Sequence, residues 1–351
     1  MTNLKKLKND IGKWSLELGF DQMGVSGIEI KDDEDRLIEW LKNNYHGSMK
    51  YMEKHGKKRA RPYELINGAL RVISLRMTYH FFDKELSERK LNNSHNAYIA
   101  NYALGRDYHK TIRSKLKRLI TRISQHSNIK EKIYFVDSAP VLERALARNA
   151  GLGWIGKNTN LINKKDGSWF FIAEIITDIE LEIDQPANNH CGTCRECIDV
   201  CPTSAIIAPY ELDARKCISY LTIENKNSIP EEMRKPIGNR IFGCDDCQIF
   251  CPWNKFAKKP VIDDFKPREG FEDASLESLF KWSEEEWDEK TRGSAIRRTG
   301  YQGWLRNIAV ALGNSKKERS TIDLLKSRKG QTGSMVDEHI DWALEQQQLS
   351  D

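Results

Sequence analysis

Four of the chain's eight cysteines lie within eleven residues, in the run CGTCRECIDVCP that begins at Cys191. The spacing C-x2-C-x2-C-x3-C-P is typical of bacterial ferredoxins, in which a short loop binds three thiolates to one cubane and the fourth thiolate binds the other cluster. A zinc site usually has two well-separated pairs of ligands, so zinc is disfavoured. Disulfides are disfavoured because Cys191, Cys194 and Cys197 follow at three-residue steps in a chain with no sign of export.

A second motif, GCDDCQIFCPWNK, has the same ending but carries Ile241 where the first cysteine of the run would stand. The cysteine left over for that cluster is Cys217. Exchanging the fourth position between the motifs, as in two-cluster ferredoxins, uses all eight cysteines once. The predicted ligands are Cys191, Cys194, Cys197 and Cys251 for cluster one, and Cys201, Cys217, Cys244 and Cys247 for cluster two. We therefore expect residues 181–258 to form a ferredoxin-like domain with two 4Fe-4S clusters that transfers single electrons.

The segment before this domain alternates between two periodicities. Apolar runs rich in β-branched and aromatic residues predict strands at 70–80, 132–140 and 168–178. Helical periodicity lies between them, at 105–124 and 141–150. We therefore expect residues 1–180 to form an α/β or α+β layer domain, and the whole chain to be an α+β multidomain protein.

The segment after Pro260 is polar and then helical. Its helical stretches are SLESLFKW, YQGWLRNIAVALGN and MVDEHIDWALEQQQ. This pattern predicts a small α-helical C-terminal domain over residues 259–351, of the HEAT-like type.

Charge and hydropathy give weaker constraints. The 56 Lys+Arg and 51 Asp+Glu give a formal charge of +5, which permits an anionic partner without requiring one. The N-terminal stretch LKKLKNDIGKW has apolar residues at helical spacing, so it predicts an amphipathic helix and not a secretion signal. No stretch approaches the ~18 uninterrupted apolar residues of a membrane span. We therefore expect a cytoplasmic monomer with no membrane contact, in a compartment where cysteines serve as metal ligands.

The run GLGWIG, from Gly151 to Gly156, matches the dinucleotide-binding pattern G-x-G-x-x-G. It follows a helix-like segment where that pattern requires a strand, so we do not assign a nucleotide site. The glycines would instead let the backbone approach something bulky, to which the next residues offer polar groups. A helix C-cap followed by a surface loop stays an alternative. The polar residues in question are Lys157, Asn158, Thr159 and Asn160.

Two single residues are also candidates for a functional role. Asp137 stands where the apolar IYFV ends, a place where loops on a rigid scaffold carry functional side chains, although an aspartate there is also a good turn or N-cap residue. His109, in GRDYHK, is not part of a corrinoid-binding pattern D-x-H-x-x-G, because Ile112 stands where that pattern has its glycine. We expect His109 to be a surface or hydrogen-bonded helix histidine.

The motifs ALGRDYHK, FVDSAPVLERALARNAGLGWIGKN, GSWFFIAEI, IGNRIFGCDDCQIFCPWNK and RRTGYQGWLRNIAVALGN, with the two cysteine motifs, strongly resemble epoxyqueuosine reductases over most of residues 10–315. The resemblance implies cobalamin and two 4Fe-4S clusters, with residues 1–180 as an α/β-type cobalamin-binding catalytic domain. It implies reduction of epoxyqueuosine to queuosine at the wobble position of tRNAs with a GUN anticodon, the last step of queuosine synthesis. An external electron donor is then required.

The resemblance also implies roles for individual residues. Asp137 matches the family's proposed proton donor, which at neutral pH requires a raised pKa. Arg59 and Arg144 match arginines that contact cobalamin, and residues 157–160 match a loop that lines the corrin. Ala100 stands where some members have a cysteine near the cobalamin, so no such thiol is essential here.

The stretch RRTGYQGWLR suggests an RNA-contacting surface. Guanidinium and aromatic groups suit phosphates and exposed bases, which favours Arg297, Arg298 and Trp304 as tRNA contacts. A charge run is often only a solvated face. Two other function classes stay open: a plain electron carrier, which would need no 180-residue leading domain, and a corrinoid-dependent reductive dehalogenase, which acts on small organohalides.

Overall fold

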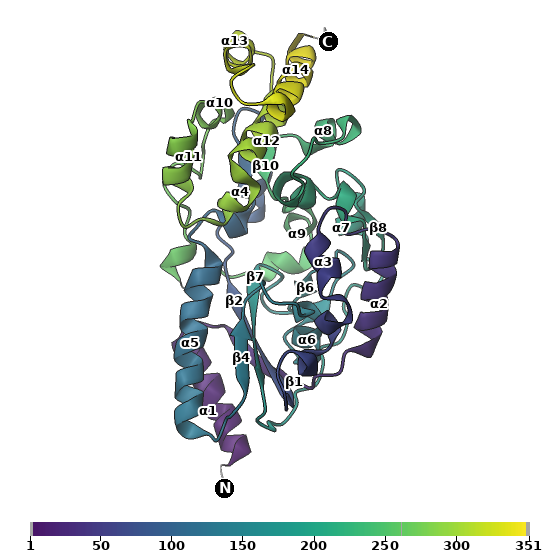
Figure 1. Ribbon diagram of the computed structural model, residues 1–351, viewed down its shortest axis with the longest axis vertical. Coiled ribbons are helices and arrows are strands. Elements are labelled where there is room, and N and C mark those ends of the chain that lie inside the picture. The colour runs from purple at the N-terminus through teal and green to yellow at the C-terminus, as the bar shows by residue number, and fades with distance from the viewer. Residues whose placement is uncertain (1–2, 261, 349–351) are drawn as a thin grey trace.

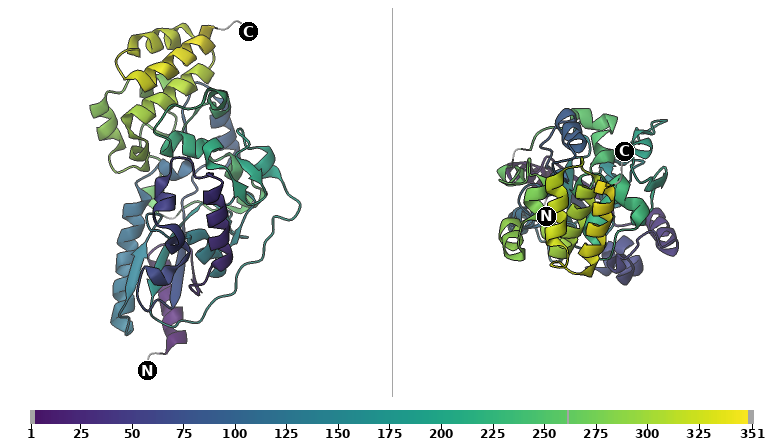
Figure 2. Two further views of the ribbon diagram at one scale, coloured as in Figure 1. Left: turned by 45° about the vertical axis from the view of Figure 1, so that its right-hand side comes forward. Right: turned by 90° about the horizontal axis from the view of Figure 1, so that it is seen from above.

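The computed structural model describes residues 3–260 and 262–348. Residues 1–2 of the expected first domain, and residues 261 and 349–351 of the expected third, lie outside the described residues. The molecule is elongated, with α1 (Leu4–Glu17) near one end and the C-terminal helices at the other (Figure 1). Seen from two further sides, these C-terminal helices form a layered cap over that end (Figure 2). 

A four-stranded sheet forms the framework of the N-terminal half. Its order is β1-β2-β7-β4, and all three pairings are antiparallel. The strands are β1 (Gln22–Ser26), β2 (Arg71–Thr78), β7 (Phe170–Thr177) and β4 (Lys132–Phe135). The three strands predicted from the sequence are therefore confirmed. The α/β expectation for this half is wrong, because each strand runs opposite to its neighbour and the layer is of the α+β type.

Helices cover the two faces of this sheet according to its period of two. Ile73, Leu75 and Met77 point to one face, where they pack with α1 and α5 (Tyr108–His126) in one buried cluster. Val72 and Ile176 point to the other face and pack with α6 (Glu143–Asn149). The predicted helices at 105–124 and 141–150 and the N-terminal amphipathic helix are confirmed. Two further helices lie on the α6 side, α2 (Lys31–Lys42) and α3 (Lys50–Lys54).

The cysteine-rich segment consists of short elements. They are α7 (Glu196–Asp199), β8 (Ile206–Ala208), β9 (Glu211–Leu212), α8 (Glu231–Ile237), β10 (Arg240–Phe242) and α9 (Asp246–Ile249). The four-residue helices α7 and α9 contact each other. Each begins one residue before the third cysteine position of its motif, Cys197 or Cys247, so the two motifs have the same local structure.

The C-terminal segment is helical, as predicted. It contains α10 (Leu276–Phe280), α11 (Glu284–Thr291), α12 (Gly300–Asn314), α13 (Arg319–Arg328) and α14 (Ser334–Gln348). Helix α12 is buried continuously from Gly303 to Gly313 and packs against α14, α10, α8 and β10. Among the described residues, no helix has the length and apolar character needed to cross a membrane.

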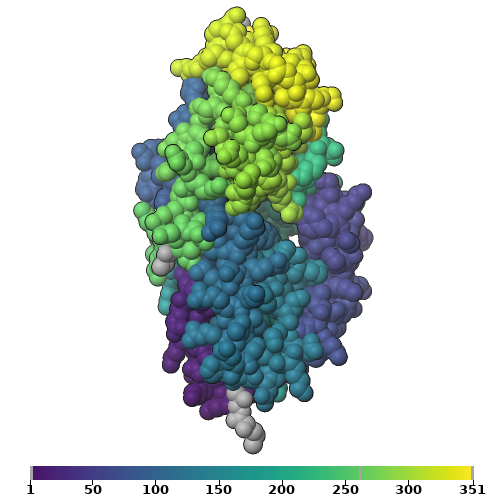
Figure 3. All heavy atoms as spheres, turned by 60° about the vertical axis from the view of Figure 1, so that its left-hand side comes forward, coloured from purple at the N-terminus to yellow at the C-terminus, as the bar shows by residue number. Residues whose placement is uncertain are grey.

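The largest buried cluster joins parts of all three segments. It combines Phe82 and Ile99 with Phe242 of the cysteine-rich segment and Trp304 of α12. Strand β3 (Tyr98–Ile99) pairs with β10, and α4 (Lys84–Asn92) contacts α9, which ties the first segment to the second. The space-filling view shows the upper and lower parts in contact over a broad boundary (Figure 3).

Candidate active site

A cavity of about 430 Å³ lies where the sheet meets the cysteine-rich segment. Aromatic side chains from α5, β7, the 101–103 turn and the residue directly after β2 line one part, and the loop after β5 (Trp154–Ile155) lines another. Thiols line a third part. The principal lining residues are Tyr79, Tyr102, Tyr108, Phe171, Asp137, Glu143, Arg144, Asn158, Thr159, Asn160, Gln248, Cys201, Cys217, Cys244 and Cys247.

All four thiols predicted for cluster two line this cavity. Burial raises the pKa of Cys217 above its usual range, and the neighbouring Cys201 adds to the increase. Burial also raises the pKa of Cys244 and of Cys247, and Cys217 adds to both increases. Thiols that are buried together in this way become stable thiolates when a metal centre supplies positive charge.

The thiols predicted for cluster one form a second group. Burial raises the pKa of Cys197 to about 11, and Cys251, Cys191 and Cys194 add to the increase. Cys251 is buried and Cys194 is exposed. Within the described residues no three His, Cys, Asp or Glu side chains are placed to hold a single metal ion. In a cubane each thiolate binds a different iron, so the thiols need not converge on one point. The ligand roles of the two thiol groups therefore stay a prediction.

The glycine-rich run has a structural role inside a small hairpin. It follows helix α6, as expected, and β5 pairs with β6 (Leu161–Ile162). A Cβ at Gly153 would lie 2.3 Å from the carbonyl oxygen of Ile162, and a Cβ at Gly156 would meet the Ile162 side chain at 2.4 Å. These glycines therefore allow close approach of the two hairpin strands, and the expectation that they also accommodate a bulky ligand stays a prediction.

The loop that follows this hairpin strand binds both cysteine motifs. Lys157 Nζ donates to the carbonyl oxygens of Gly192 at 2.6 Å and Cys194 at 2.7 Å. Asn158 Nδ2 donates to the Cys247 carbonyl at 3.1 Å, and Asn160 Nδ2 lies 3.8 Å from Cys247 Sγ. Lys157 is therefore directed to the cluster-one motif and lies outside the residues that line the cavity, and its contact with cobalamin stays a prediction.

Asp137 projects into the cavity from the end of β4. Its φ of 58° is in the left-handed region, which aspartate tolerates better than most residues. Its carboxylate accepts a hydrogen bond from Tyr108 Oη at 2.6 Å and lies 3.4 Å from His109 Nε2. Its backbone N–H donates to Glu143 Oε1 at 2.7 Å. The side chain is 60% exposed and caps no helix, so the N-cap alternative is excluded.

The charges around Asp137 are arranged opposite to the expectation of a raised pKa. Partial desolvation by the surrounding protein favours the neutral acid, but the hydrogen bonds from His109 and Tyr108 outweigh this and lower its pKa to about 2. Burial and the Asp137 charge raise the pKa of Glu143 to about 8. Burial opposes protonation of His109, yet its bonds to Asp107 and Asp137 raise its pKa to about 9. At neutral pH the protons therefore reside on His109 and Glu143.

Several of these residues were not identified from the sequence. His109 is a hydrogen-bonded helix histidine, as expected, with Nδ1 2.9 Å from Asp107 Oδ1. Its contact with Asp137 joins the start of α5 to the end of β4, and no local pattern reports such a contact. Glu143 and Tyr108 lie in the quoted motifs, but their proximity to Asp137 depends on the fold.

The arginines predicted as cobalamin contacts lie in different environments. Arg144 lines the cavity and donates to the Thr159 carbonyl at 3.0 Å. Arg59 is buried and donates to the carbonyl oxygens of Tyr51 at 2.6 Å and Met52 at 3.2 Å. Ala100 is buried, and a Cβ at Gly243 would lie 2.6 Å from its methyl group.

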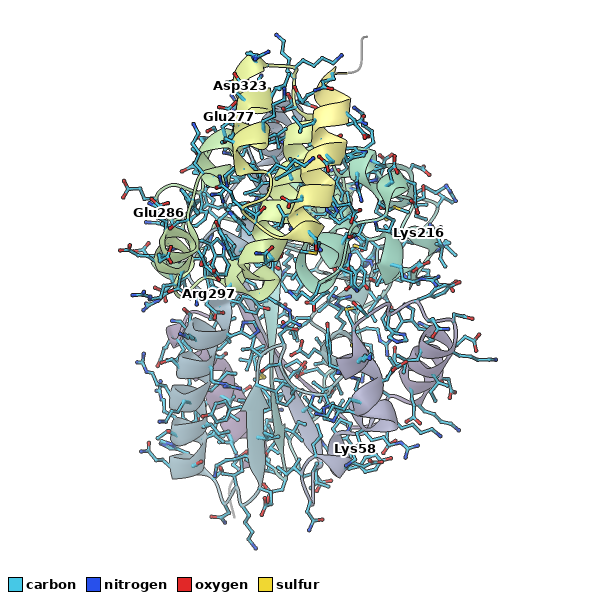
Figure 4. All side chains as sticks on the ribbon, turned by 45° about the horizontal axis from the view of Figure 1, so that its top comes forward. Lys58, Lys216, Glu277, Glu286, Arg297 and Asp323 are labelled. Atoms are coloured by element: carbon cyan, nitrogen blue, oxygen red, sulfur yellow. The ribbon has the colours of Figure 1, made fainter. Side chains whose placement is uncertain are left out.

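The residues predicted to contact tRNA are divided between the surface and the core. Arg297 pairs with Asp288 and lies where the helical cap meets the rest of the molecule (Figure 4). Arg298 pairs with Glu224, and its positive charge lowers the pKa of Asp137. Trp304 is fully buried, with its ring 5.9 Å from that of Trp282. An RNA contact by Trp304 is therefore wrong, because the burial of α12 places its indole in the core.

Two family models match parts of the chain. Residues 59–138 match the one described as epoxyqueuosine reductase QueG, DUF1730. Residues 190–254 match the one described as a 4Fe-4S double cluster binding domain.

Similar proteins and structures cover nearly the whole chain. The epoxyqueuosine reductase of Xanthomonas campestris is 54% identical over 333 residues, 95% of this chain and 94% of the relative. That of Escherichia coli K12 is 49% identical, covering 98% of this chain and 90% of the relative. A crystal structure of epoxyqueuosine reductase with an epoxyqueuosine-modified tRNA-Tyr stem loop has a TM-score of 0.89 at 28% identity, with 98% and 91% coverage. A Bacillus subtilis structure with its catalytic aspartate loop swung out of the active site has a TM-score of 0.89 at 29% identity, with the same coverage. The chain belongs to the epoxyqueuosine reductase family.

Proposed function

We propose that this protein reduces the epoxide of epoxyqueuosine in tRNA to the alkene of queuosine, using two 4Fe-4S clusters and cobalamin. One observation carries the proposal: a single cavity is lined both by the four cluster-two thiols and by Asp137 and Glu143. Electrons and protons can therefore reach the same bound molecule. A plain electron carrier would have no use for an acid group beside its cluster.

The proposal includes the finer assignments made from the sequence. The modified base is the wobble base of tRNAs with a GUN anticodon, and the reaction is the last step of queuosine synthesis. The enzyme acts as a monomer in the cytoplasm. Residues 1–180 form the catalytic segment, residues 181–258 the electron-transfer segment and residues 259–351 the helical cap.

The residues that surround the cavity suit the proposed cofactors. Each predicted cluster has four thiols grouped in space. For cobalamin, a large macrocycle with amide side chains, the cavity offers the amides of Asn158 and Asn160, the Thr159 hydroxyl and the Arg144 guanidinium. Cobalamin, when bound, supplies a strongly reducing cobalt centre. Arg59 lies outside the lining and would act by holding the 51–52 backbone.

The side chains around Asp137 supply the protons of the reaction. Conversion of an epoxide to an alkene consumes two electrons and two protons and releases the oxygen as water. Asp137 is ionised in the free protein, so it first accepts a proton from His109 Nε2 and then donates it to the epoxide oxygen as the carbon–oxygen bond breaks. Glu143, bound to the Asp137 backbone, holds a second proton. Two protonated groups thus stand beside a reaction that needs two protons.

Asp137→Asn should abolish most conversion of epoxyqueuosine-containing tRNA to queuosine-containing tRNA under anaerobic conditions. Loss of a proton donor typically lowers the rate by ~10²- to 10⁴-fold. Mass spectrometry of the nucleosides measures the product, and iron and corrinoid contents should stay normal. Asp32→Asn, at an exposed carboxylate, is the matched control. Near-normal turnover by Asp137→Asn would remove this residue from the reaction.

The rate should also fall as the pH rises from about 8 to 9. Glu143 and His109 have pKa values of about 8 and 9 and lose their protons in this range. Both residues are therefore protonated below it and deprotonated above it. His109→Gln should remove the upper part of this decline. The raised pKa of His109 also means that its contribution to stability, full below about pH 6.5, is lost as the pH rises through 9. A pH–rate profile of His109→Gln identical to that of the wild type would contradict the proton transfer.

Cys217→Ala should remove the same cluster as Cys244→Ala. Each variant should retain about four of about eight irons after anaerobic reconstitution, and the double variant should lose no more than either single one. Iron analysis and electron paramagnetic resonance measure the remaining cluster. Cys191→Ala should instead affect the other cluster. Two intact clusters in Cys217→Ala would show that the crossed ligand assignment is wrong.

Replacing Arg297 and Arg298 together by Ala should weaken tRNA binding and flatten its salt dependence. Each lost phosphate contact removes up to about 0.7 from the log–log slope for a single-stranded loop. The structure offers an alternative, in which both arginines serve only their pairs with Asp288 and Glu224. In that case the melting temperature would fall and the salt slope would stay unchanged, which would exclude the RNA contact.

A further inference from the structure

We propose that a lysine-rich surface beside the cluster-one thiols is the docking site of the electron donor, an acidic one-electron carrier protein. The lysine surface is formed by Lys164, Lys165, Lys255, Lys258 and Lys259. This inference rests on the proposed function and adds its missing partner.

The lysine surface borders a second cavity, of about 470 Å³. Lys164, Lys165 and Lys258 line this cavity together with Trp154 and His190. The Trp154 indole N–H donates to Cys191 Sγ at 3.4 Å. One side chain therefore separates the cavity from a predicted cluster ligand.

Aromatic rings continue from this point to the exposed surface. The Trp154 and Trp253 rings lie 5.1 Å apart, and the Trp253 and Phe256 rings lie 6.2 Å apart. His190 lies 4.9 Å from Trp154 and 5.6 Å from Trp253. Phe256 is 46% exposed, an unusual state for a phenylalanine, and it lies among Lys255, Lys258 and Lys259 in the sequence. A protein that contacts Phe256 is thus connected by packed rings to Cys191.

The two thiol groups differ in how a second protein can reach them. The cluster-two thiols line the cavity that contains Asp137, where the substrate is expected. In the cluster-one group Cys194 is exposed, whereas each cluster-two thiol is only partly exposed. A docking protein therefore has its most direct access at cluster one, on whose side the lysine surface lies.

The charge of the lysine surface identifies the kind of partner. Asp166 lies beside it but is bound to Arg76 and to Lys258, whose Nζ is 3.1 Å from Asp166 Oδ1. Within residues 3–260 and 262–348, Lys164, Lys165, Lys255 and Lys259 have no carboxylate within ion-pair distance. A surface with this excess of positive charge attracts an acidic protein and accelerates its encounter. Electron-transfer complexes are typically small and transient, so a few charges and one exposed ring suffice.

The electron balance fixes what the partner must do. Each encounter oxidises the carrier by one electron and reduces the cluster-one site by one electron. Two encounters supply the two electrons that, with two protons, convert one epoxide to an alkene and water. An acidic flavin or iron-sulfur carrier meets this requirement.

The test uses the holoenzyme with charge reversal at three lysines, Lys164→Glu, Lys165→Glu and Lys259→Glu together. The probe is a reduced bacterial flavodoxin, an acidic FMN protein. Its rate of cluster reduction, followed by stopped flow at low ionic strength, should fall on the order of 10-fold or more. Its binding affinity should fall as well, and the salt dependence of both quantities should flatten. Reduction by dithionite, a small anion that needs no docking surface, should proceed to completion in the variant.

A matched control reverses three exposed lysines of the helical cap, Lys281, Lys316 and Lys326, and should leave flavodoxin binding and cluster reduction unchanged. Unchanged flavodoxin affinity and rate in the Lys164/Lys165/Lys259 variant would overturn the proposal. A loss of tRNA affinity with normal reduction by flavodoxin would also overturn it, because the surface would then serve RNA. Dithionite-driven turnover keeps the two proposals apart: if the wild type forms no queuosine with dithionite, the proposed function fails whatever the lysine surface binds.

Discussion

The loop Lys157–Asn160 holds both cysteine motifs in place, and the rest of the site depends on this contact. Lys157 is bound to backbone carbonyls of the first motif, and Asn158 to a backbone carbonyl of the second. These hydrogen bonds join a side-chain ammonium and amide to backbone carbonyls at a partly buried junction, where loss of a partner is costly. Because the same loop begins at the hairpin packed on α6, it fixes the thiols relative to the sheet that carries Asp137.

The electrostatics of the cavity follow from that placement. Asp137 lies 3.4 Å from His109 and its backbone N–H binds Glu143, and three titratable groups this close together cannot all keep their ordinary pKa values. The hydrogen bonds from Tyr108 and His109 make Asp137, and not Glu143, the ionised carboxyl of the group. Asp137 is therefore the negative charge of the group, and its neighbours carry the protons. The proton donor is therefore not Asp137 alone but the connected set of Asp137, His109 and Glu143.

Buried polar contacts join the helical cap to the cysteine-rich segment. Arg306 of α12 is fully buried and donates to the carbonyl oxygens of Leu221 and Asn225, each at 2.8 Å. Asn307 donates to the carbonyls of Thr222 and Ile241. Such contacts explain why the cap and the cluster segment share one core, and why the expected boundary near residue 258 does not coincide with a gap in packing.

The sequence alone determined those features that depend on neighbours along the chain. The apolar runs of β2 and β7 and the periodicity of α1, α5 and α12 are local, and each predicted its element correctly. The three-residue steps of the cysteines are local as well, and they predicted the double-cluster domain that the family model matches. Only the tertiary structure decided the antiparallel order of the sheet, the burial of Trp304, the direction of the Lys157 ammonium group and the ionised state of Asp137. Each of these depends on groups from distant segments, because burial and pKa are set by what surrounds a side chain in space. A sequence pattern reports only what surrounds it along the chain.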